Sequence, residues 1–243
     1  AALVMLLVLG WYLVMRNSGQ SDLSASNTAD APVSNTIVST TEMPPLTRTI
    51  PQPPNTNFYQ NSKQNLKGDL LINFVGFSLY YPKEWKVNGP QPGTAPNARG
   101  KFLDISRKTA DDRMQEQMLI SYYPSKGTYG EDAEKFPLMV KETNETLTKI
   151  LPGYMQISAG PIKLNGDWQA YEVKFQAGGK SPSGEKLTVW GRRIFIPAAR
   201  PGVKNGFEIT MLATSLAEGI QSVDDVGVRG ELASVLYSFE PSQ

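Results

Sequence analysis

The sequence predicts an α+β fold, in which a central antiparallel β-sheet is flanked by helices as an α/β/α sandwich. Several runs within residues 66–243 alternate apolar and polar side chains, the period of a half-buried strand. Two segments, 131–151 and 224–239, instead repeat apolar residues every three or four positions, as a helix with one buried face does. Asn165-Gly166 lies between two strand runs and is a strong hairpin signal, which indicates antiparallel pairing.

The first strands are expected around an aromatic corner. Residues 70–74 and 77–81 are short apolar or alternating runs separated by Gly76, which predicts two strands or one strand with a bulge. Pro82 ends the pairing because it has no backbone N–H, and Trp85 follows in a short helical corner. Further along we expect a loop at 88–100, strands at 101–107 and 118–123, and a surface turn at 109–117.

The helix expected at 131–151 has an apolar face and a marked end. Acidic residues in its first turn complement the helix dipole, and Pro152-Gly153 terminates it. Pro137 lies inside the pattern, so the first turn is expected to be separate or kinked. The apolar positions are Phe136, Met139, Val140, Thr143, Leu147 and Ile150.

The second half of the chain predicts a meander of strands and a closing helix. Ser222, three residues before Asp225, resembles a capping box at the start of the helix, and Pro241 follows its end. Its apolar stripe is Val228, Leu232, Val235, Leu236 and Phe239. The expected strands are 154–164, 167–176, 186–196 and 206–214, with a flexible loop at 177–184.

The first 65 residues predict an anchor and a tether in front of a domain at 66–243. Residues 1–15 carry no charge and Arg16 follows, so 1–16 is a transmembrane anchor or an uncleaved signal, with a buried core helix as a further alternative. Residues 17–65 are rich in Ser, Thr, Asn, Gln and Pro, which predicts a disordered linker because little apolar surface could offset its ordering entropy. A proline-rich docking motif is the alternative to a plain spacer.

Composition narrows the classes of function. The net charge of +1, from 24 basic and 23 acidic residues, provides no basic surface for nucleic acid. The chain has no cysteine, which excludes disulfides and thiolate chemistry in the sequence shown. It also has no histidine, the usual general base and the commonest transition-metal ligand. We therefore expect no enzymatic activity, no metal and no cofactor.

Three features of the chain have a counterpart in a known family. A Phe-x-Leu-x-Tyr-Pro-x-x-Trp corner spans Phe77 to Trp85, a helix leads into the Asn-Gly hairpin, and the closing helix runs into Pro241. Over residues 66–241 the chain thereby resembles the PsbP-like superfamily, which includes DcrB-type bacterial envelope proteins. The resemblance implies a central antiparallel sheet between helices, and members that are mostly binding or assembly factors without enzymatic activity.

Three groups of residues are candidate sites, each with a structural alternative. Basic residues beside a Pro/Gly loop could grip an anionic partner or form a solvated strand end: Arg192, Arg193, Arg200 and Lys204. Aromatic residues could line a groove or occupy alternating core and surface positions: Tyr80, Tyr81, Trp85, Tyr122 and Tyr123. Acidic residues could bind a hard cation or form a surface turn: Asp104, Asp111, Asp112 and Glu116.

These observations predict a membrane-tethered extracytoplasmic domain, periplasmic or extracellular, that binds or assembles without catalysing a reaction. Residues 1–15 would hold it to the membrane, and its partner would be a protein of a membrane or envelope complex. One alternative is a ligand-binding or carboxylate-dependent hydrolytic enzyme, which requires two inward carboxylates about 5–10 Å apart in a cleft. The other is a partner-binding domain on the cytoplasmic side.

Overall fold

The domain is built mostly from β-strands. The computed structural model describes residues 49–93, 99–164, 168–181, 184–198 and 203–242. The expected anchor, the linker up to residue 48, the Asn165-Gly166 turn and Arg200 lie outside these residues. About 47% of the described residues are in strands and 21% in helices.

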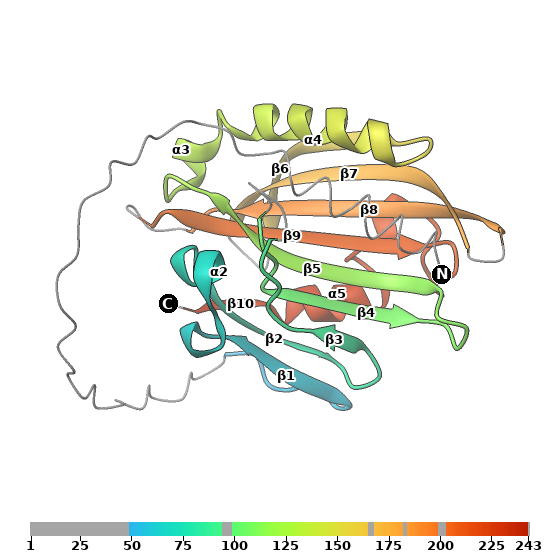
Figure 1. The fold of residues 1–243 in the computed structure, drawn as a ribbon, viewed down its shortest axis with the longest axis horizontal. Helices are drawn as coiled ribbons and strands as arrows, with labels where there is room; N and C mark the ends of the chain where they lie inside the picture. Colours follow the sequence, from blue (N-terminus) through green and yellow to red (C-terminus); the bar gives the residue numbers. More distant parts are fainter. Residues whose placement is uncertain (1–48, 94–98, 165–167, 182–183, 199–202, 243) are drawn as a thin grey trace.

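Two antiparallel sheets make up the domain (Figure 1). The smaller has the order β1-β2-β10, and the larger has the order β3-β4-β5-β9-β8-β7-β6. The strands are β1 (Thr56–Asn61), β2 (Gly76–Pro82), β3 (Lys86–Asn88), β4 (Leu103–Lys108), β5 (Met114–Pro124), β6 (Met155–Leu164), β7 (Trp168–Lys180), β8 (Lys186–Ile196), β9 (Asn205–Thr214) and β10 (Glu240–Ser242).

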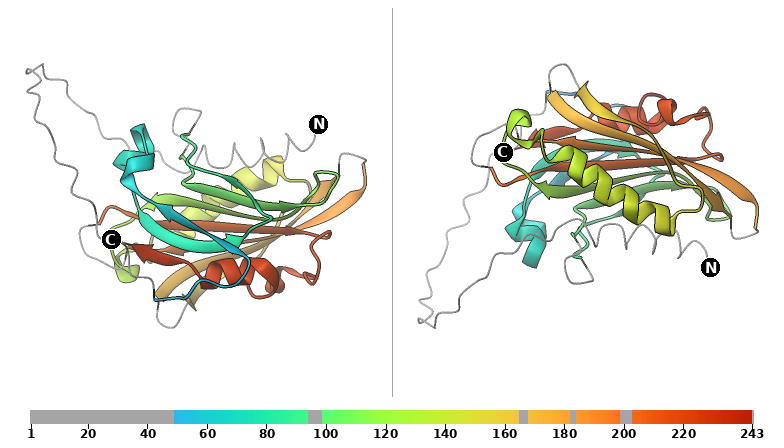
Figure 2. Two further views of the ribbon diagram at one scale, coloured as in Figure 1. Left: turned by 90° about the horizontal axis from the view of Figure 1, so that it is seen from below. Right: turned by 90° about the horizontal axis from the view of Figure 1, so that it is seen from above.

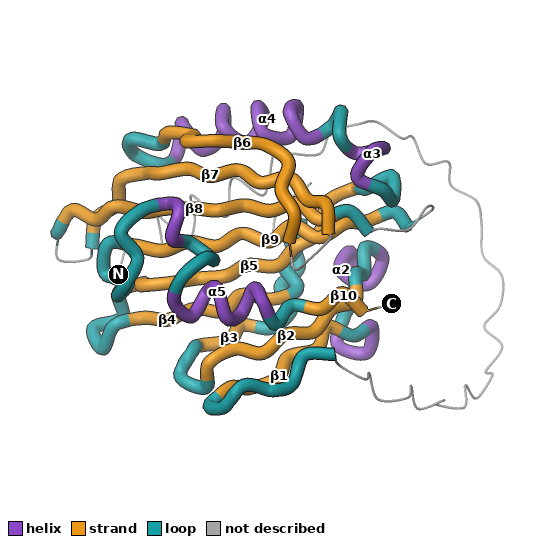
Figure 3. Tube along the Cα trace, turned by 180° about the vertical axis from the view of Figure 1, so that it is seen from behind, coloured by secondary structure: helices purple, strands orange, loops and turns teal. Residues whose placement is uncertain are grey.

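The helices are few, and all but one are short. They are η1 (Lys63–Asn65), α2 (Gly68–Ile72), α3 (Tyr129–Asp132), α4 (Phe136–Ile150), η2 (Val223–Asp225) and α5 (Gly230–Tyr237). Helix α4 lies across one face of the seven-stranded sheet (Figure 2). The three-stranded sheet and α5 lie on the opposite face (Figure 3).

The predicted α/β/α sandwich is therefore wrong. One face of the large sheet is covered mainly by a second sheet, because Phe77 and Leu79 of β2 share a core with Ile105 of β4 and Ile209 of β9. The ring of Phe77 lies 5.6 Å from that of Phe239 and 6.3 Å from that of Phe207. Burial of these rings stabilises the contact between the two sheets. The prediction expected a layer of helices in that place.

Two predictions near the start of the domain differ from the structure. Residues 70–74, expected as a strand, lie largely in α2, where Leu70 is buried while Leu71 and Ile72 are exposed. A strand in the sheet would have buried alternate residues instead. Residues 56–61, expected within the linker, form β1 and pair with β2 from Thr56–Pro82 to Asn61–Phe77. The folded region therefore begins before residue 66.

The closing helix is also shorter than predicted. Residues 223–225 form only a single 3₁₀ turn, and α5 begins at Gly230. Gly227 and Gly230 have φ of 67° and 68°, in the left-handed region, so the backbone cannot continue as an α-helix between the two segments. The predicted capping contact is confirmed, since the Ser222 backbone N–H donates to Asp225 Oδ2 at 3.0 Å.

Several other predictions are confirmed. Helix α4 buries Phe136, Val140, Thr143 and Leu147 as its period predicts. Pro137 stands in its first turn, so α3 is a separate turn, which the capping box of Thr128 and Glu131 begins. The four strands β6 to β9 follow one another as a meander.

Some boundaries differ. The turn expected at 109–117 is shorter, because β5 already begins at Met114. Trp85 follows a turn in place of the expected helical corner.

Candidate functional site

The predicted basic surface is not formed by its two central arginines. Arg192 and Arg193 are adjacent in β8, so their side chains point to opposite faces of the sheet, and both are buried. Arg192 forms an ion pair with Glu172 and donates from Nη1 to the carbonyl oxygen of Gly227 at 3.1 Å. It therefore ties β7 and β8 to the segment before α5.

Arg193 lies on the face that α4 covers. Its Nη1 donates to Thr143 Oγ1 at 3.0 Å, and its Nε lies 3.2 Å from Oε1 of Glu208. Burial lowers the pKa of the Arg193 guanidinium, and the carboxylate of Glu208 opposes that shift. Arg200 lies outside the described residues, and Lys204 is exposed. Among the three described members of the predicted surface, Lys204 alone can meet a partner.

The aromatic residues do not line a single groove. Tyr122 and Tyr123 point to opposite faces of β5. The Tyr122 hydroxyl donates to Asp69, while the Tyr123 hydroxyl donates to Asp132 at 3.0 Å. Burial is the main cause that raises the pKa of both phenols, with the neighbouring carboxylates adding to it. The core-and-surface alternative therefore describes them.

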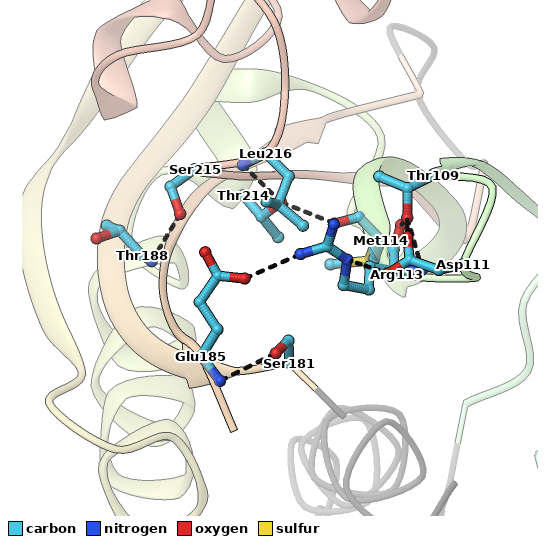
Figure 4. A network of polar contacts seen from close by, with 10 residues as sticks. All are labelled: Thr109, Asp111, Arg113, Met114, Ser181, Glu185, Thr188, Thr214, Ser215 and Leu216. Carbon is cyan, nitrogen blue, oxygen red and sulfur yellow. Dashed lines mark hydrogen bonds and ion pairs between the residues drawn. The ribbon is translucent and has the colours of Figure 1, made fainter. Parts of the chain in front are cut away.

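The acidic residues near the β4–β5 turn are held by basic neighbours (Figure 4). Asp111 Oδ2 lies 2.7 Å from Nε of Arg113, whose Nη1 donates to Glu185 at 2.9 Å. The hydrogen bond from Thr109 lowers the pKa of Asp111, followed by the bond from Arg113. Among the described residues, no group of three or more acidic side chains is placed to hold a metal ion. The cation alternative for these residues thus has no supporting geometry.

Two carboxylates that sequence reasoning did not bring together share one arginine. Arg107 Nη1 lies 3.2 Å from Oε2 of Glu231 and 3.7 Å from Oε2 of Glu116. Trp85 Nε1 also donates to Glu231 Oε2, at 2.9 Å. Burial raises the pKa of the Glu116 carboxyl, and the nearby Glu231 raises it further, while Arg107 lowers it. Glu116 is 2% exposed, so no substrate reaches it in this conformation.

A cavity under α4 lies beside the buried Arg193. Its volume is about 10 Å³, and Thr143, Tyr154 and Arg193 are among the residues that line it. That volume is about what one water molecule needs. The cavity is too small for an organic ligand.

An exposed apolar surface lies at one end of the molecule. It is formed by Leu71 and Ile72 of α2 and by Val203 before β9, which are 42%, 82% and 38% exposed. Asn205 Nδ2 donates to Asn73 Oδ1 at 3.3 Å and so holds the start of β9 against the end of α2. We call these three residues the apolar end. Their segments are neighbours through the bond between Asn205 and Asn73.

The signal for the apolar end was present in the sequence but ambiguous. Leu70, Leu71 and Ile72 form an apolar run whose period cannot distinguish a strand from one helical turn. Leu70 alone is buried, against Gly100, where a Cβ atom would stand 2.6 Å from Leu70 Cδ2. The other two members are left facing solvent.

The chain thus forms a mostly-β domain of two sheets with an exposed apolar end. Except for the exposed Lys204, the charged side chains described above form bonds within the domain. No protein-family model matches the chain, and no curated protein matches it either. Among the described residues, no helix is long and apolar enough to cross a membrane.

Proposed function

We propose that the protein is a membrane-tethered extracytoplasmic domain that binds or assembles with a partner and catalyses no reaction. Residues 1–15 would anchor it, and the polar segment that follows would act as the tether. The motifs that resemble the PsbP-like superfamily predict this class of function, but the α/β/α sandwich that the same resemblance implies is wrong.

The apolar end is the observation that carries the proposal. Ile72 is 82% exposed on a turn that Leu70 fixes to the core, so the exposed position is set by packing. The part of the chain that the structure describes begins at Thr49. Its backbone N–H donates to Glu240 of β10 at 3.1 Å. Ser242 of β10 pairs with Gly76, four residues after Ile72. The tether therefore joins the domain beside its apolar end.

A carboxylate-dependent enzyme is the second candidate, and the contact of Glu116 and Glu231 with Arg107 is the observation that favours it. A raised pKa on one of two neighbouring carboxyl groups is typical of a general acid. The burial of Glu116 and the bond from Trp85 to Glu231 give the cluster a structural explanation, which we prefer.

The test uses the full chain produced in cells and recovered from membranes after chemical cross-linking. We expect the protein to stay with the membrane under alkaline extraction and to be released by Leu7→Asp, which places a charge in the apolar run. We also expect specific cross-linked partners, which decrease in the Ile72→Asp variant. Met155→Asp is the matched control, because Met155 is 53% exposed at the opposite end of the large sheet.

Two results would contradict the proposal. One is a full chain that alkaline extraction removes as readily as it removes the Leu7→Asp variant. The other is turnover of a small substrate that Glu231→Gln abolishes while the variant stays folded, which would establish the enzyme instead.

A further inference from the structure

The chain contains three Asn-Gly dipeptides, at residues 88–89, 165–166 and 205–206. An asparagine side chain reacts with the backbone most readily in this dipeptide, because glycine has no Cβ atom to shield the attacking nitrogen. Asn165 and Gly166 lie outside the described residues. The fold places the other two dipeptides in opposite surroundings, so that Asn88 and Asn205 can be compared.

Asn88 is exposed, and the groups that would react are not engaged elsewhere. It is the last residue of β3, a three-residue strand at the edge of the large sheet (Figure 1). Its side chain forms no hydrogen bond with the described part of the chain, and the Gly89 N–H donates to no oxygen there. The space around Gly89 is open, since no atom lies within 4 Å of a Cβ built on it.

Asn205 is held on all sides. It is 8% exposed, and its Nδ2 donates to Asn73 Oδ1 at 3.3 Å. A Cβ atom on Gly206 would stand 2.5 Å from Tyr123 Cε1 and 2.6 Å from the Ile196 carbonyl oxygen. Strand β9 is paired on one side with β5 and on the other with β8. A ring between Asn205 and Gly206 can therefore close only if this part of the sheet opens.

We propose that Asn88 is a site of spontaneous deamidation in the folded protein, with water as the reagent and aspartate and isoaspartate as the products. The fold protects Asn205 from the same reaction. This inference goes beyond the proposed function and does not depend on the membrane tether.

The reaction needs no oxidant, reductant or catalyst. The backbone nitrogen of Gly89 loses its proton and attacks Cγ of Asn88, so that an N–Cγ bond forms. The Cγ–Nδ2 bond breaks, and Nδ2 leaves with the proton as ammonia. Water then opens the resulting succinimide ring. Hydrolysis of the N–Cγ bond gives aspartate, while hydrolysis of the bond from the same nitrogen to the Asn88 main-chain carbonyl carbon gives isoaspartate.

Isoaspartate would change the backbone between two fixed pairs. Asn88 pairs with Asp104 of β4, and Gln91 forms an isolated bridge with Lys101. In that bridge, each residue's N–H donates to the other's carbonyl oxygen at 2.8 Å. Isoaspartate leads the main chain through Cγ, which adds one carbon on one side of this ladder and none on the other. The bridge between Gln91 and Lys101 is therefore expected to open.

The experiment incubates the full chain at mildly alkaline pH and follows each Asn-Gly peptide by mass spectrometry. An isoaspartate-specific methyltransferase identifies the second product. Gly89→Ala is the matched variant, because it keeps Asn88 and slows the attack on it. The open space at Gly89 predicts that this variant folds, and circular dichroism checks this. A parallel incubation in urea measures both asparagines without the fold.

We expect deamidation at Asn88 to be several-fold faster than at Asn205 in the folded chain and comparable to it in urea. Gly89→Ala should slow the reaction at Asn88 several-fold and leave Asn205 unchanged. After incubation, hydrogen exchange at the Gln91 and Lys101 amides should become faster in the wild type and stay unchanged in Gly89→Ala.

Two results would overturn the site. One is an equal rate at Asn88 and Asn205 in the folded chain, and the other is a rate at Asn88 that Gly89→Ala does not lower. Unchanged exchange at Gln91 and Lys101 in a sample rich in isoaspartate would overturn the opening of the bridge.

Discussion

Trp85 Nε1 donates a 2.9 Å hydrogen bond to Oε2 of Glu231, which joins the corner after β2 to helix α5 across 146 residues of sequence. The same carboxylate oxygen lies 3.2 Å from Nη1 of Arg107 in β4. The aromatic corner is therefore fastened by a polar bond as well as by packing. Trp85 is 4% exposed and the Glu231 side chain is 33% exposed, so the donor is shielded from water while the acceptor is partly hydrated.

The hydrogen bond between Trp85 and Glu231 predicts that substitutions at the two residues have non-additive effects on the free energy of unfolding. Trp85→Phe keeps an aromatic ring but removes the donor, and we expect a loss of about 2 kcal/mol in the free energy of unfolding, since a hydrogen bond to a charged group contributes roughly that much. Urea denaturation of Trp85→Phe, Glu231→Ala and the double variant measures the coupling. Strictly additive losses would mean that the bond contributes nothing beyond ring packing.

Glu116 predicts a pH dependence of stability. Its folded pKa lies above the usual 4.5 because of burial, and the unfolded chain has the usual value. The folded state therefore binds this proton more tightly, and the stability it contributes is present below pH 4.5 and lost as pH rises through the folded pKa. Glu116→Gln removes this titration.

We accordingly expect the difference in unfolding free energy, variant minus wild type, to shift in favour of Glu116→Gln from about pH 4 to about pH 7. Arg107 favours the ionised carboxylate and so acts against this slope, but burial and Glu231 together outweigh it. Denaturation at several pH values measures it, with Glu185→Gln as an exposed control. A slope of opposite sign would show that Arg107 outweighs the burial of Glu116.

Local patterns predicted the elements whose burial repeats with a regular period. Helix α4 and the meander β6 to β9 carry that signal through Val140, Leu147 and similar positions, and the structure confirms them. Strand β1 could not be predicted in the same way. Its only apolar pair is Phe58-Tyr59, and its stability comes from pairing with β2, a contact that local composition does not encode.

The burial of two of the predicted basic residues has a cause that the sequence partly contained. Arg192 and Arg193 are adjacent in a predicted strand, so period-two geometry already placed them on opposite faces. Their buried partners, Glu172 and Glu208, could not be predicted from the local sequence, because they come from the neighbouring strands β7 and β9. The apolar end was missed because a three-residue apolar run fits a strand as well as a helical turn.

Asp132 predicts a large loss of stability on truncation. The carboxylate is fully buried and accepts from the Tyr123 hydroxyl at 3.0 Å, Ser125 Oγ at 2.5 Å and the Lys126 backbone N–H at 2.8 Å. We expect Asp132→Ala to lower the unfolding free energy by about 3 kcal/mol, since three donors, two of them buried, lose their acceptor. Tyr123→Phe should cost only about 1 kcal/mol because it removes one donor. Thermal denaturation compares them, and equal losses would contradict this account of the cluster.

Gly191 in β8 lies directly opposite Phe175 in β7, and the ring covers the space that a side chain would fill. A Cβ atom at Gly191 would stand 2.0 Å from Phe175 Cζ, so Gly191→Ala forces the buried ring out of its packing against Tyr154. We expect a loss of about 2 kcal/mol or more in the free energy of unfolding, as overpacked cores show. Adding Phe175→Leu should recover part of that loss, because the smaller side chain makes room. Gly160→Ala on the exposed edge strand β6, where nothing lies within 4 Å of the added atom, is the control and should be close to neutral. If Gly191→Ala were as well tolerated as Gly160→Ala in chemical denaturation, the close cross-strand contact of Phe175 with Gly191 would not exist in solution.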